Sequence, residues 1–326
     1  MEKSVIILGA KGRFGRTALE AFNNKGWRVS AFARHWEQNE KTSNTRYLSG
    51  NAFDLKLLTR ACMDHDVILN ALNPKYEDWE EMLPTITRNI ISAGIASGAT
   101  VMIPGNVYNY GNELPPVISE ETPHVPNTKK GRLRIEMEQA YKDACADGLK
   151  TIVLRGGDFF EGKDTGNWFE TYITNKIDRG IVTYPGPLNS IHSWAYLPDV
   201  TRAMVELAER RHLMNGFEEF GFKGYSVTGA ELVKALEKAC RRELRAKKFP
   251  WLLVRGMALF SRQIHEILEM RYLWQRPHEI DEKKLRGILP DFQGTPFQSA
   301  VNNVVGKQPL SNMKATGNRS LEPVKT

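Results

Sequence analysis

Cysteine is scarce in this sequence, whose 326 residues include only Cys62, Cys145 and Cys240. The three lie far apart without C-x-x-C spacing, so we expect reduced thiols rather than a disulfide framework or a cysteine-based zinc site. No run of about 18 apolar residues occurs, which excludes a membrane-spanning helix. The first apolar run, residues 5–8, is too short for a signal peptide. We therefore expect a cytoplasmic protein without a membrane partner.

Several catalytic motifs are also missing. The sequence has no H-E-x-x-H element, no G-x-S-x-G turn and no G-x-x-x-x-G-K-[ST] loop, so zinc proteases, α/β-hydrolases and P-loop enzymes are excluded and no metal is expected. The composition, 41% hydrophobic and 25% charged, is typical of a soluble globular protein.

The charge is uneven along the chain. The formal net charge is +7, and residues 241–262 carry seven Lys or Arg against Glu243 alone. A basic surface suits an anionic ligand. We expect a solvated helix face plus a disordered tail here, with a nucleic-acid surface as the alternative, and do not predict a nucleic-acid partner.

Short β-rich runs alternate with helical patterns along the first 155 residues. Strands that alternate with helices pair in parallel with right-handed crossovers, so we expect an α/β fold with a doubly wound parallel sheet of the Rossmann type. The expected strands are Ser4–Leu8, Arg28–Phe32, Arg46–Leu48, Val67–Asn70, Thr100–Ile103 and Thr151–Arg155, and the expected helices are Arg13–Lys25, Leu55–Met63, Glu81–Ser97 and Lys129–Asp147.

After Arg155 the pattern changes to helical segments separated by loops rich in glycine and proline. This predicts a smaller, mostly helical substrate lobe that shares elements with the first. The expected helices are Trp168–Arg179, Asp199–Arg210, Gly229–Arg242 and Trp251–Met270. We expect an NAD(P)-binding Rossmann core at residues 1–155, a substrate lobe at 156–305 and a disordered tail at 306–326.

The strongest chemical signal is the glycine-rich turn Gly9-Ala10-Lys11-Gly12-Arg13-Phe14-Gly15, which lies between an expected strand and an expected helix. Gly9 permits a tight turn, Gly12 lets the backbone approach a pyrophosphate, and Gly15 lets the helix pack close to the strand. The free N–H groups of the first helical turn then face the phosphates. In this context the turn predicts dinucleotide binding, with a purely structural turn as the alternative.

The spacing G-x-x-G-x-x-G resembles that of the extended and atypical short-chain dehydrogenase/reductase superfamily, which includes the NAD-dependent epimerase/dehydratase family. The resemblance covers about residues 3–300. The similar segments are the adenine-contacting turn at residues 50–54 with Asn51 and Ala52, the cofactor loop Asn70-Ala71-Leu72-Asn73, the pair Val107-Tyr108, the segment 154–160 and the stretch 192–200. The resemblance implies cofactor contacts from the glycine-rich turn, including Lys11, Arg13 and Phe14, and from the adenine turn and the cofactor loop.

The end of the second expected strand bears on the choice of cofactor. NAD-binding proteins place an acid there, which binds the ribose hydroxyls and repels a 2′-phosphate. Here the strand ends in Ala33-Arg34-His35, with no acid before Glu37. Arg34 offers a planar fork suited to a phosphate, and Arg13 could add a second positive group. This favours NADP(H). The alternative, with Arg34 in solvent, is a protein that binds NAD(H).

The catalytic positions of the resembled family are altered. Its members use a Ser or Thr after the fifth strand and a Tyr-x-x-x-Lys pair in the pattern Y-G-x-S-K-x-x-x-E. Aligned on Glu136, the pattern places Thr128 at the Tyr position and Arg132 at the Lys position, while Pro104 falls at the Ser position. A Thr hydroxyl does not act as a general acid near neutral pH.

Two interpretations follow from this loss. In the first, another residue at the cleft carries the proton, with Tyr108 as the first candidate and Asp158 and His192 as weaker ones. Tyr108 is then a catalytic phenol; the alternative is that it only lines the wall. The chain would be an NADP(H)-dependent oxidoreductase or epimerase acting on a small carbonyl, alcohol or sugar(-nucleotide) substrate. In the second, it is a non-catalytic NmrA-like sensor of NADP(H). The sequence leaves open whether the chain forms a homodimer.

Overall fold

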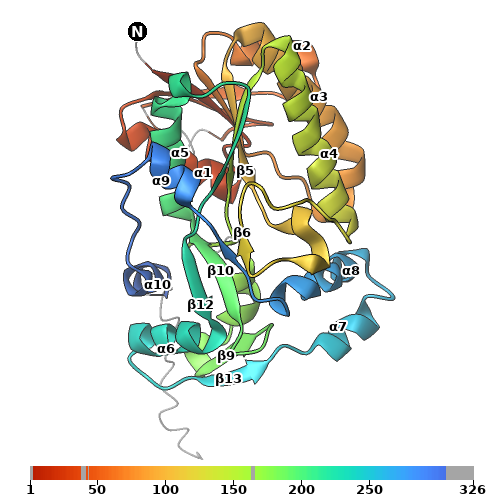
Figure 1. Ribbon diagram of the computed structural model, residues 1–326, viewed down its shortest axis with the longest axis vertical. Helices are drawn as coiled ribbons and strands as arrows, with labels where there is room; N and C mark the ends of the chain where they lie inside the picture. The colour runs from red at the N-terminus through yellow and green to blue at the C-terminus, as the bar shows by residue number, and fades with distance from the viewer. Residues whose placement is uncertain (1–2, 38–41, 43, 163–165, 306–326) are drawn as a thin grey trace, which may run out of the picture.

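The computed structural model describes residues 3–37, 42, 44–162 and 166–305. The expected tail at 306–326 lies outside the described residues. Figure 1 shows a central sheet flanked by helices in the upper part of the view and the remaining C-terminal elements below it.

The central sheet has seven strands in the order β11-β7-β5-β4-β1-β2-β3, and every neighbouring pair is parallel. This confirms the predicted doubly wound Rossmann sheet. The strands are β1 (Ser4–Leu8), β2 (Arg28–Ala33), β3 (Thr45–Ser49), β4 (Val67–Asn70), β5 (Thr100–Gly105), β7 (Lys150–Arg155) and β11 (Phe217–Gly221).

Helices cover both faces of this sheet because its strands are apolar on both sides. In β1, Val5 and Ile7 face a cluster with α1 and α5, whereas Ile6 and Leu8 face a cluster with α2, α3 and α4. Alternate residues of a strand point to opposite faces, so a continuous apolar run fits a strand covered twice. The helices are α1 (Arg13–Asn24), α2 (Leu55–Cys62), α3 (Trp79–Ser97), α4 (Lys129–Asp143) and α5 (Leu197–Glu209).

The C-terminal part contains helices together with three small sheets that the sequence analysis did not predict. Its elements also complete the Rossmann layer, because β11 pairs with β7 and α5 packs against α1. The small sheets are β12-β10-β8, β13-β9 and β14-β6, built from β6 (Val117–Ile118), β8 (Asp158–Phe160), β9 (Ile181–Tyr184), β10 (Ile191–Tyr196), β12 (Tyr225–Thr228), β13 (Arg245–Lys248) and β14 (Glu279–Ile280).

Two expected helices are wrong in extent. The expected helix Trp168–Arg179 consists of one π-helical turn, η5 (Phe169–Ile173), and one 3-10 turn, η6 (Ile177–Arg179). The expected helix Trp251–Met270 is divided into α7 (Trp251–Met257) and α8 (Arg262–Glu269). The division has a local cause: the Ser261 hydroxyl accepts a hydrogen bond from the Ile264 N–H and caps a new helix there.

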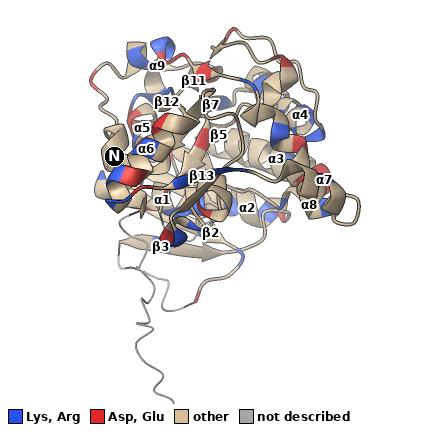
Figure 2. Cartoon of the chain, turned by 90° about the horizontal axis from the view of Figure 1, so that it is seen from below, with Lys and Arg blue, Asp and Glu red and all other residues tan. Residues whose placement is uncertain are grey.

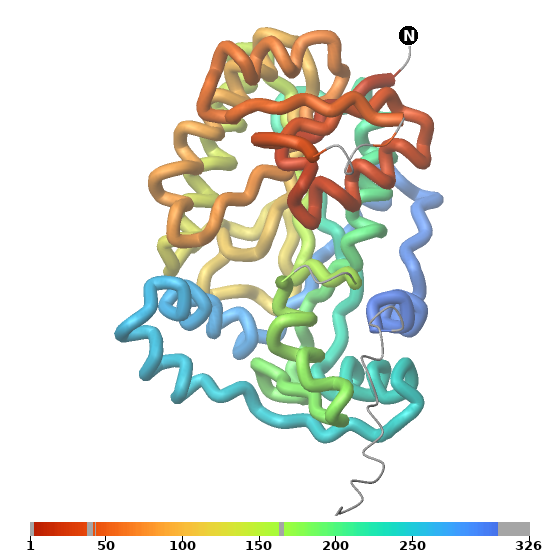
Figure 3. The backbone as a smooth tube through the Cα atoms, turned by 180° about the vertical axis from the view of Figure 1, so that it is seen from behind, coloured from red at the N-terminus to blue at the C-terminus, as the bar shows by residue number. Residues whose placement is uncertain are grey.

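The remaining helices are α6 (Gly229–Cys240), α9 (Lys283–Ile288) and α10 (Phe297–Val305). The 3-10 turns that bear on the site are η2 (Tyr76–Asp78), η3 (Tyr108–Glu113) and η8 (Met270–Trp274). Figure 3, seen from behind, shows the segment with α7 and α8 running along the lower edge of the molecule. None of the helices among the described residues has the length and apolar character to cross a membrane.

Candidate active site at the carboxyl edge of the sheet

The glycine-rich turn connects β1 to α1, and two of its glycines, Gly9 and Gly15, have a steric reason. Gly9 has a φ of +83°, and a Cβ there would lie 2.8 Å from the Ala71 carbonyl oxygen. A Cβ on Gly15 would lie 2.3 Å from the Gly9 oxygen, so the helix can pack on the turn only with glycine at that position. Gly12 has an ordinary φ of −70°, and its Cβ would come no closer than 3.2 Å to the Gly9 oxygen.

The N-terminus of α1 fits a pyrophosphate. Gly12 is the N-cap residue, no side chain caps this end, and the first turn contains no acid. The early N–H groups of a helix need an acceptor, and the helix dipole favours an anionic one. Phe14 is buried and packs against Phe159, so its side chain belongs to the core and only its backbone lies at the helix end.

Positive side chains lie beside this turn. Arg34 follows β2 directly and is exposed. The Lys11 ammonium lies 5.5 Å from the centre of the Trp36 ring, so the turn and the end of β2 meet there. Arg13, in contrast, forms an ion pair with Glu161 at 2.7 Å and donates to the Phe159 oxygen. In this structure Arg13 ties α1 to the β8 region, which differs from its expected contact with the cofactor phosphate.

The predicted adenine turn and cofactor loop are both ordered by internal hydrogen bonds. The Asn51 side-chain oxygen accepts from the Phe53 N–H at 3.1 Å, and Asn89 of α3 donates to the Ala52 and Phe53 oxygens. In the loop after β4, the Asn70 oxygen accepts from the Leu72 N–H at 3.1 Å. Ala71 lies against Gly9, and Asn73 is exposed at the end of the loop.

The structure corrects the predicted catalytic register on α4. Thr128 is the N-cap of this helix, and its buried hydroxyl accepts from the Gly131 N–H at 3.0 Å. Arg132 is exposed, whereas Lys130 and Arg134 are buried. Residues two apart on a helix point to nearly opposite sides, so Arg132 faces away from the side that these two share. Glu136 is likewise exposed.

A shift of two residues brings the pattern and the structure into agreement. Lys130 then takes the Tyr position, Arg134 the Lys position, and Gly131 and Glu138 match the pattern's Gly and Glu. Gly131 is needed for close packing, because a Cβ there would lie 2.5 Å from the Tyr108 carbonyl oxygen. These two matches are the signal in the sequence that could have identified Lys130 and Arg134.

Arg134 points at the end of β5. Its Nη2 donates to the Pro104 oxygen at 2.7 Å, and its buried Nε–H has no partner among the described residues. Burial lowers the pKa of Arg134. A buried donor without an acceptor is costly.

Lys130 is engaged by the C-terminal part of the chain. Its ammonium pairs with Glu266 and Glu269 of α8 and lies 5.1 Å from the centre of the Tyr76 ring. Lys130 therefore connects the Rossmann layer to α8 at the place where the family pattern has its proton donor.

Two phenols meet beside these cations. Tyr108, at the start of η3, shares a hydrogen bond of 2.9 Å with the Tyr76 hydroxyl from η2. Burial raises the pKa of both groups, and neighbouring Tyr76 and Asp158 raise that of Tyr108 further. Both phenols are neutral near pH 7 and can donate a proton. Nothing in the sequence pattern pointed to Tyr76.

A carboxylate and an imidazole form the opposite side of the group. His192 of β10 bonds to the Asp158 carboxylate of β8 at 2.7 Å, and the Asp158 side chain is 21% exposed while that of His192 is 4% exposed. The His192 ring stacks on Trp274 at 4.2 Å. Asp158 thus faces outward and His192 supports it from behind. Burial, with a smaller contribution from the Asp158 charge, raises the pKa of Tyr184 and Tyr272.

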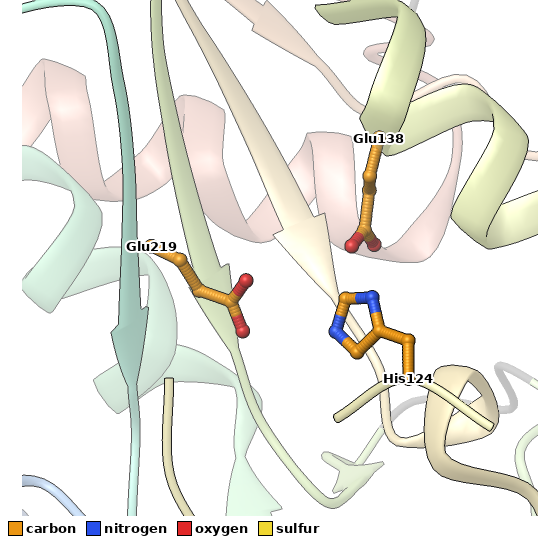
Figure 4. A group of neighbouring side chains, drawn as sticks. All are labelled: His124, Glu138 and Glu219. Carbon is orange, nitrogen blue, oxygen red and sulfur yellow. The ribbon is translucent and has the colours of Figure 1, made fainter. Parts of the chain in front are cut away.

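A separate group of His124, Glu138 and Glu219 has the composition of a metal site, and Figure 4 shows the three side chains facing one another. However, the Arg155 guanidinium already bonds to both carboxylates, at 2.7 Å from Glu138 and 2.6 Å from Glu219. The Arg155 side chain therefore already supplies the positive charge that pairs with Glu138 and Glu219. These ion pairs connect α4, β7 and β11, and we do not assign a metal to this group.

A turn that fits a dinucleotide, placed at the switch point of a doubly wound parallel sheet, defines a dinucleotide-binding Rossmann fold. A sequence model described as NAD(P)H-binding matches residues 9–181, more than half of the chain. The chain belongs to this NAD(P)H-binding family, in agreement with the predicted dinucleotide binding. No curated protein matches the sequence.

Solved structures of the same fold include several sugar-nucleotide enzymes. MoeE5 in complex with UDP-glucose and NAD is 17% identical, with 93% of this chain and 97% of that chain covered and a TM-score of 0.73. UDP-N-acetylglucosamine 4-epimerase from Bacillus cereus is 13% identical, with 93% and 98% covered and a TM-score of 0.73. The Bordetella bronchiseptica enzyme WbmH in complex with NAD+ is 15% identical, with 94% and 98% covered and a TM-score of 0.71. At these identities the likeness establishes the shared fold.

Proposed function

We propose that the chain is an NADP(H)-dependent oxidoreductase or epimerase that acts on a small carbonyl, alcohol or sugar-derived substrate. The observation that carries the proposal is the meeting of two proton-carrying pairs, Tyr108 with Tyr76 and Asp158 with His192, near the buried cation Arg134. Burial, together with the neighbouring Tyr76 and Asp158, raises the pKa of Tyr108, and perturbed pKa values of this kind cluster at functional sites.

The preference for NADP(H) rests on the charges around the adenosine end. Arg34 is exposed where an NAD-binding protein would carry an acid, and Lys11 lies over Trp36 beside it. A guanidinium and an ammonium favour a phosphate at this place, and no carboxylate of residues 28–36 opposes it.

In the proposed reaction, Arg134, Tyr108 and Asp158 each have a separate role. The nicotinamide supplies or accepts the hydride. Arg134 would hold the ribose hydroxyls as a cation, at the position where the resembled family has its Lys. Tyr108 donates a proton to the substrate oxygen and regains one through Tyr76, because the two hydroxyls share a hydrogen bond. Asp158, exposed in front of His192, accepts a proton in the oxidative direction or orients a substrate hydroxyl.

A sensor function is the second candidate, and a specific contact favours it. Lys130 occupies the position of the family's proton donor but is held by Glu266 and Glu269 of α8. A bound dinucleotide that displaced these pairs would move α8 without any reaction. The NmrA-like alternative therefore has a structural basis in this chain.

The experiment that separates the two functions follows nicotinamide absorbance with purified full chain. NADPH is tested against carbonyl compounds, and NADP+ against alcohols and UDP-sugars, with epimerisation followed by product analysis. The enzyme proposal expects turnover of at least one substrate with NADP(H) and weaker turnover with NAD(H). Tight NADPH binding without turnover of any compound, together with a change in α8 hydrogen exchange on binding, would replace it with the sensor function.

A further inference from the structure

Residues 252–260 present an unusual amount of apolar surface. Of the described residues, this short segment includes the three most exposed large hydrophobic side chains, Phe260 at 91%, Leu252 at 85% and Leu259 at 81%, and it adds Leu253 and Met257. Exposed apolar residues scattered singly need no explanation, but a contiguous group marks an interaction surface.

The segment is anchored, so its exposure is a property of the folded chain. Val254 is buried, and the Trp251 Nε1–H donates to the Pro185 oxygen at 2.7 Å while Arg271 lies over the Trp251 ring. On a helix, Leu252 and Leu253 project away from the side that Trp251 and Val254 share. One face of α7 holds the segment in place and the other carries the apolar group, which Leu259 and Phe260 extend.

Basic side chains flank this apolar group along the chain. The exposed residues Arg245, Lys247 and Lys248 of β13 precede it, and Arg255 and Arg262 lie within and after it. Residues 241–262 contain a single acid, Glu243. Figure 2, seen from below, shows blue residues along β13, and Figure 1 places β13 and α7 together at the lower edge.

We propose that α7 and the turn after it bind the surface of an anionic lipid bilayer. Leu252, Leu259 and Phe260 enter the boundary between headgroups and acyl chains, and the flanking Lys and Arg side chains contact the lipid phosphates. The seven residues of α7 are too few to span a bilayer, so the contact is peripheral. The proposal therefore departs from the expectation of no membrane partner, which rested on the lack of a spanning segment.

Charge and apolarity together favour a membrane over other occupants. Nucleic acid would neutralise the basic residues but would leave Leu252, Leu259 and Phe260 in water. A second copy on a two-fold axis would cover the apolar group, but it would place two sets of like charges against each other. An anionic bilayer would contact the basic side chains through its phosphates and would also cover the apolar side chains.

The test is sedimentation of the full chain with vesicles of phosphatidylcholine alone or mixed with phosphatidylglycerol. The expected result is binding to the mixed vesicles, at least about tenfold stronger than to phosphatidylcholine and weakened by salt. The double variant Leu259→Ser/Phe260→Ser should lose at least about tenfold in affinity, and Lys247→Gln/Lys248→Gln should approach the level seen with phosphatidylcholine.

Leu213→Ser is the matched control, because Leu213 is 60% exposed on a 3-10 turn outside this segment. It should bind mixed vesicles as the unchanged chain does, and all variants should keep their melting temperature and NADPH affinity. Equal vesicle binding by Leu259→Ser/Phe260→Ser, or no binding to mixed vesicles, overturns the proposal. Self-association without vesicles that the same double variant abolishes assigns the surface to a second copy and also overturns it.

Discussion

Single side chains at the ends of parallel strands carry most of the chemistry that we propose for this protein. Arg34 stands one residue beyond β2, Tyr108 three beyond β5, and Asp158 three beyond β7. Positions just past a strand's carboxyl end are held by the sheet but face the crevice where ligands bind. Each can therefore change ligand preference or reaction without disturbing the sheet itself.

The cofactor preference is testable at Arg34. Arg34→Asp should weaken NADPH binding by about 2 kcal/mol or more, because a charge-assisted hydrogen bond is lost and a like charge faces the 2′-phosphate. NADH binding should change far less. Calorimetric titration of both cofactors checks this, with Arg60→Asp on the exposed side of α2 as the control. Equal losses for the two cofactors would remove Arg34 from the site.

His278 gives a prediction on pH. Burial, with His192 nearby, lowers the pKa of His278 to about 4, and its Nδ1 bonds to the Arg276 oxygen at 2.9 Å. An unfolded His takes up a proton below about pH 6.5, whereas folded His278 does so only near pH 4. As the pH is lowered from about 6.5 to about 4, the free energy of unfolding should therefore decrease by up to about 3 kcal/mol.

Denaturant titrations across this pH range measure the effect. His278→Gln should reduce the loss of stability on acidification, because no proton is then taken up at this position on unfolding. His212→Gln, at an exposed position, should leave the pH dependence as it is. If the two variants behave alike, His278 does not carry the effect.

At the scale of elements, two glycines at the N-terminus of α1 are expected to differ in role: Gly12 leaves room for the dinucleotide, and Gly15 allows the helix to pack. Gly12→Val should abolish dinucleotide binding yet leave a folded protein, because the position has an ordinary φ and space for a side chain only where a ligand would lie. Gly15→Ala should instead lower the melting temperature, since its Cβ would meet the Gly9 oxygen at 2.3 Å. NADPH titration and thermal melting distinguish them. Retained NADPH affinity in Gly12→Val would show that the turn binds no cofactor.

The contact between α4 and α8 depends on Lys130. Lys130→Met should lower the free energy of unfolding by about 3 kcal/mol, because it leaves the partly buried carboxylates of Glu266 and Glu269 without their cation. Lys129→Met, which removes only an exposed pair with Glu80, should change stability little. Chemical denaturation measures both, and faster hydrogen exchange in α8 should accompany the first variant. Equal stabilities would show that Lys130 does not hold α8.

Elements were predictable from the sequence where one local pattern determined them. β1 and β4 have the expected bounds because their apolar runs are closed by Gly9 and by the loop after Asn70. The short strands β8, β9, β12 and β13 consist mostly of half-buried or exposed residues in sheets of two or three strands, so they lacked a distinct pattern. The register on α4 was missed because the pattern was aligned on Glu136 with Thr128 at the hydroxyl site, although Gly131 and Glu138 match it two residues further on.

At the scale of the whole molecule, the site exists because the two parts of the chain meet. Tyr108 comes from the Rossmann layer, Asp158 and His192 from strands of the small sheet, and Trp274 from η8 supports the imidazole. No sequence spacing predicts such a meeting, since it depends on how β8 and β10 pair beyond the end of the central sheet. The glycine-rich turn alone predicted where a dinucleotide would bind. For the acid/base residues, the sequence suggested candidates but not which of them would lie together.

The most direct measurement is therefore the turnover number of Tyr108→Phe against its NADPH affinity, on a substrate found in the screen. The account predicts that kcat falls at least about 100-fold while the Kd for NADPH stays within about twofold, because a proton donor is lost and the cofactor contacts remain. Thr128→Ala, which removes a helix cap, should cost about 1 kcal/mol of stability and little turnover. A Tyr108→Phe variant that keeps most of its turnover would contradict the account.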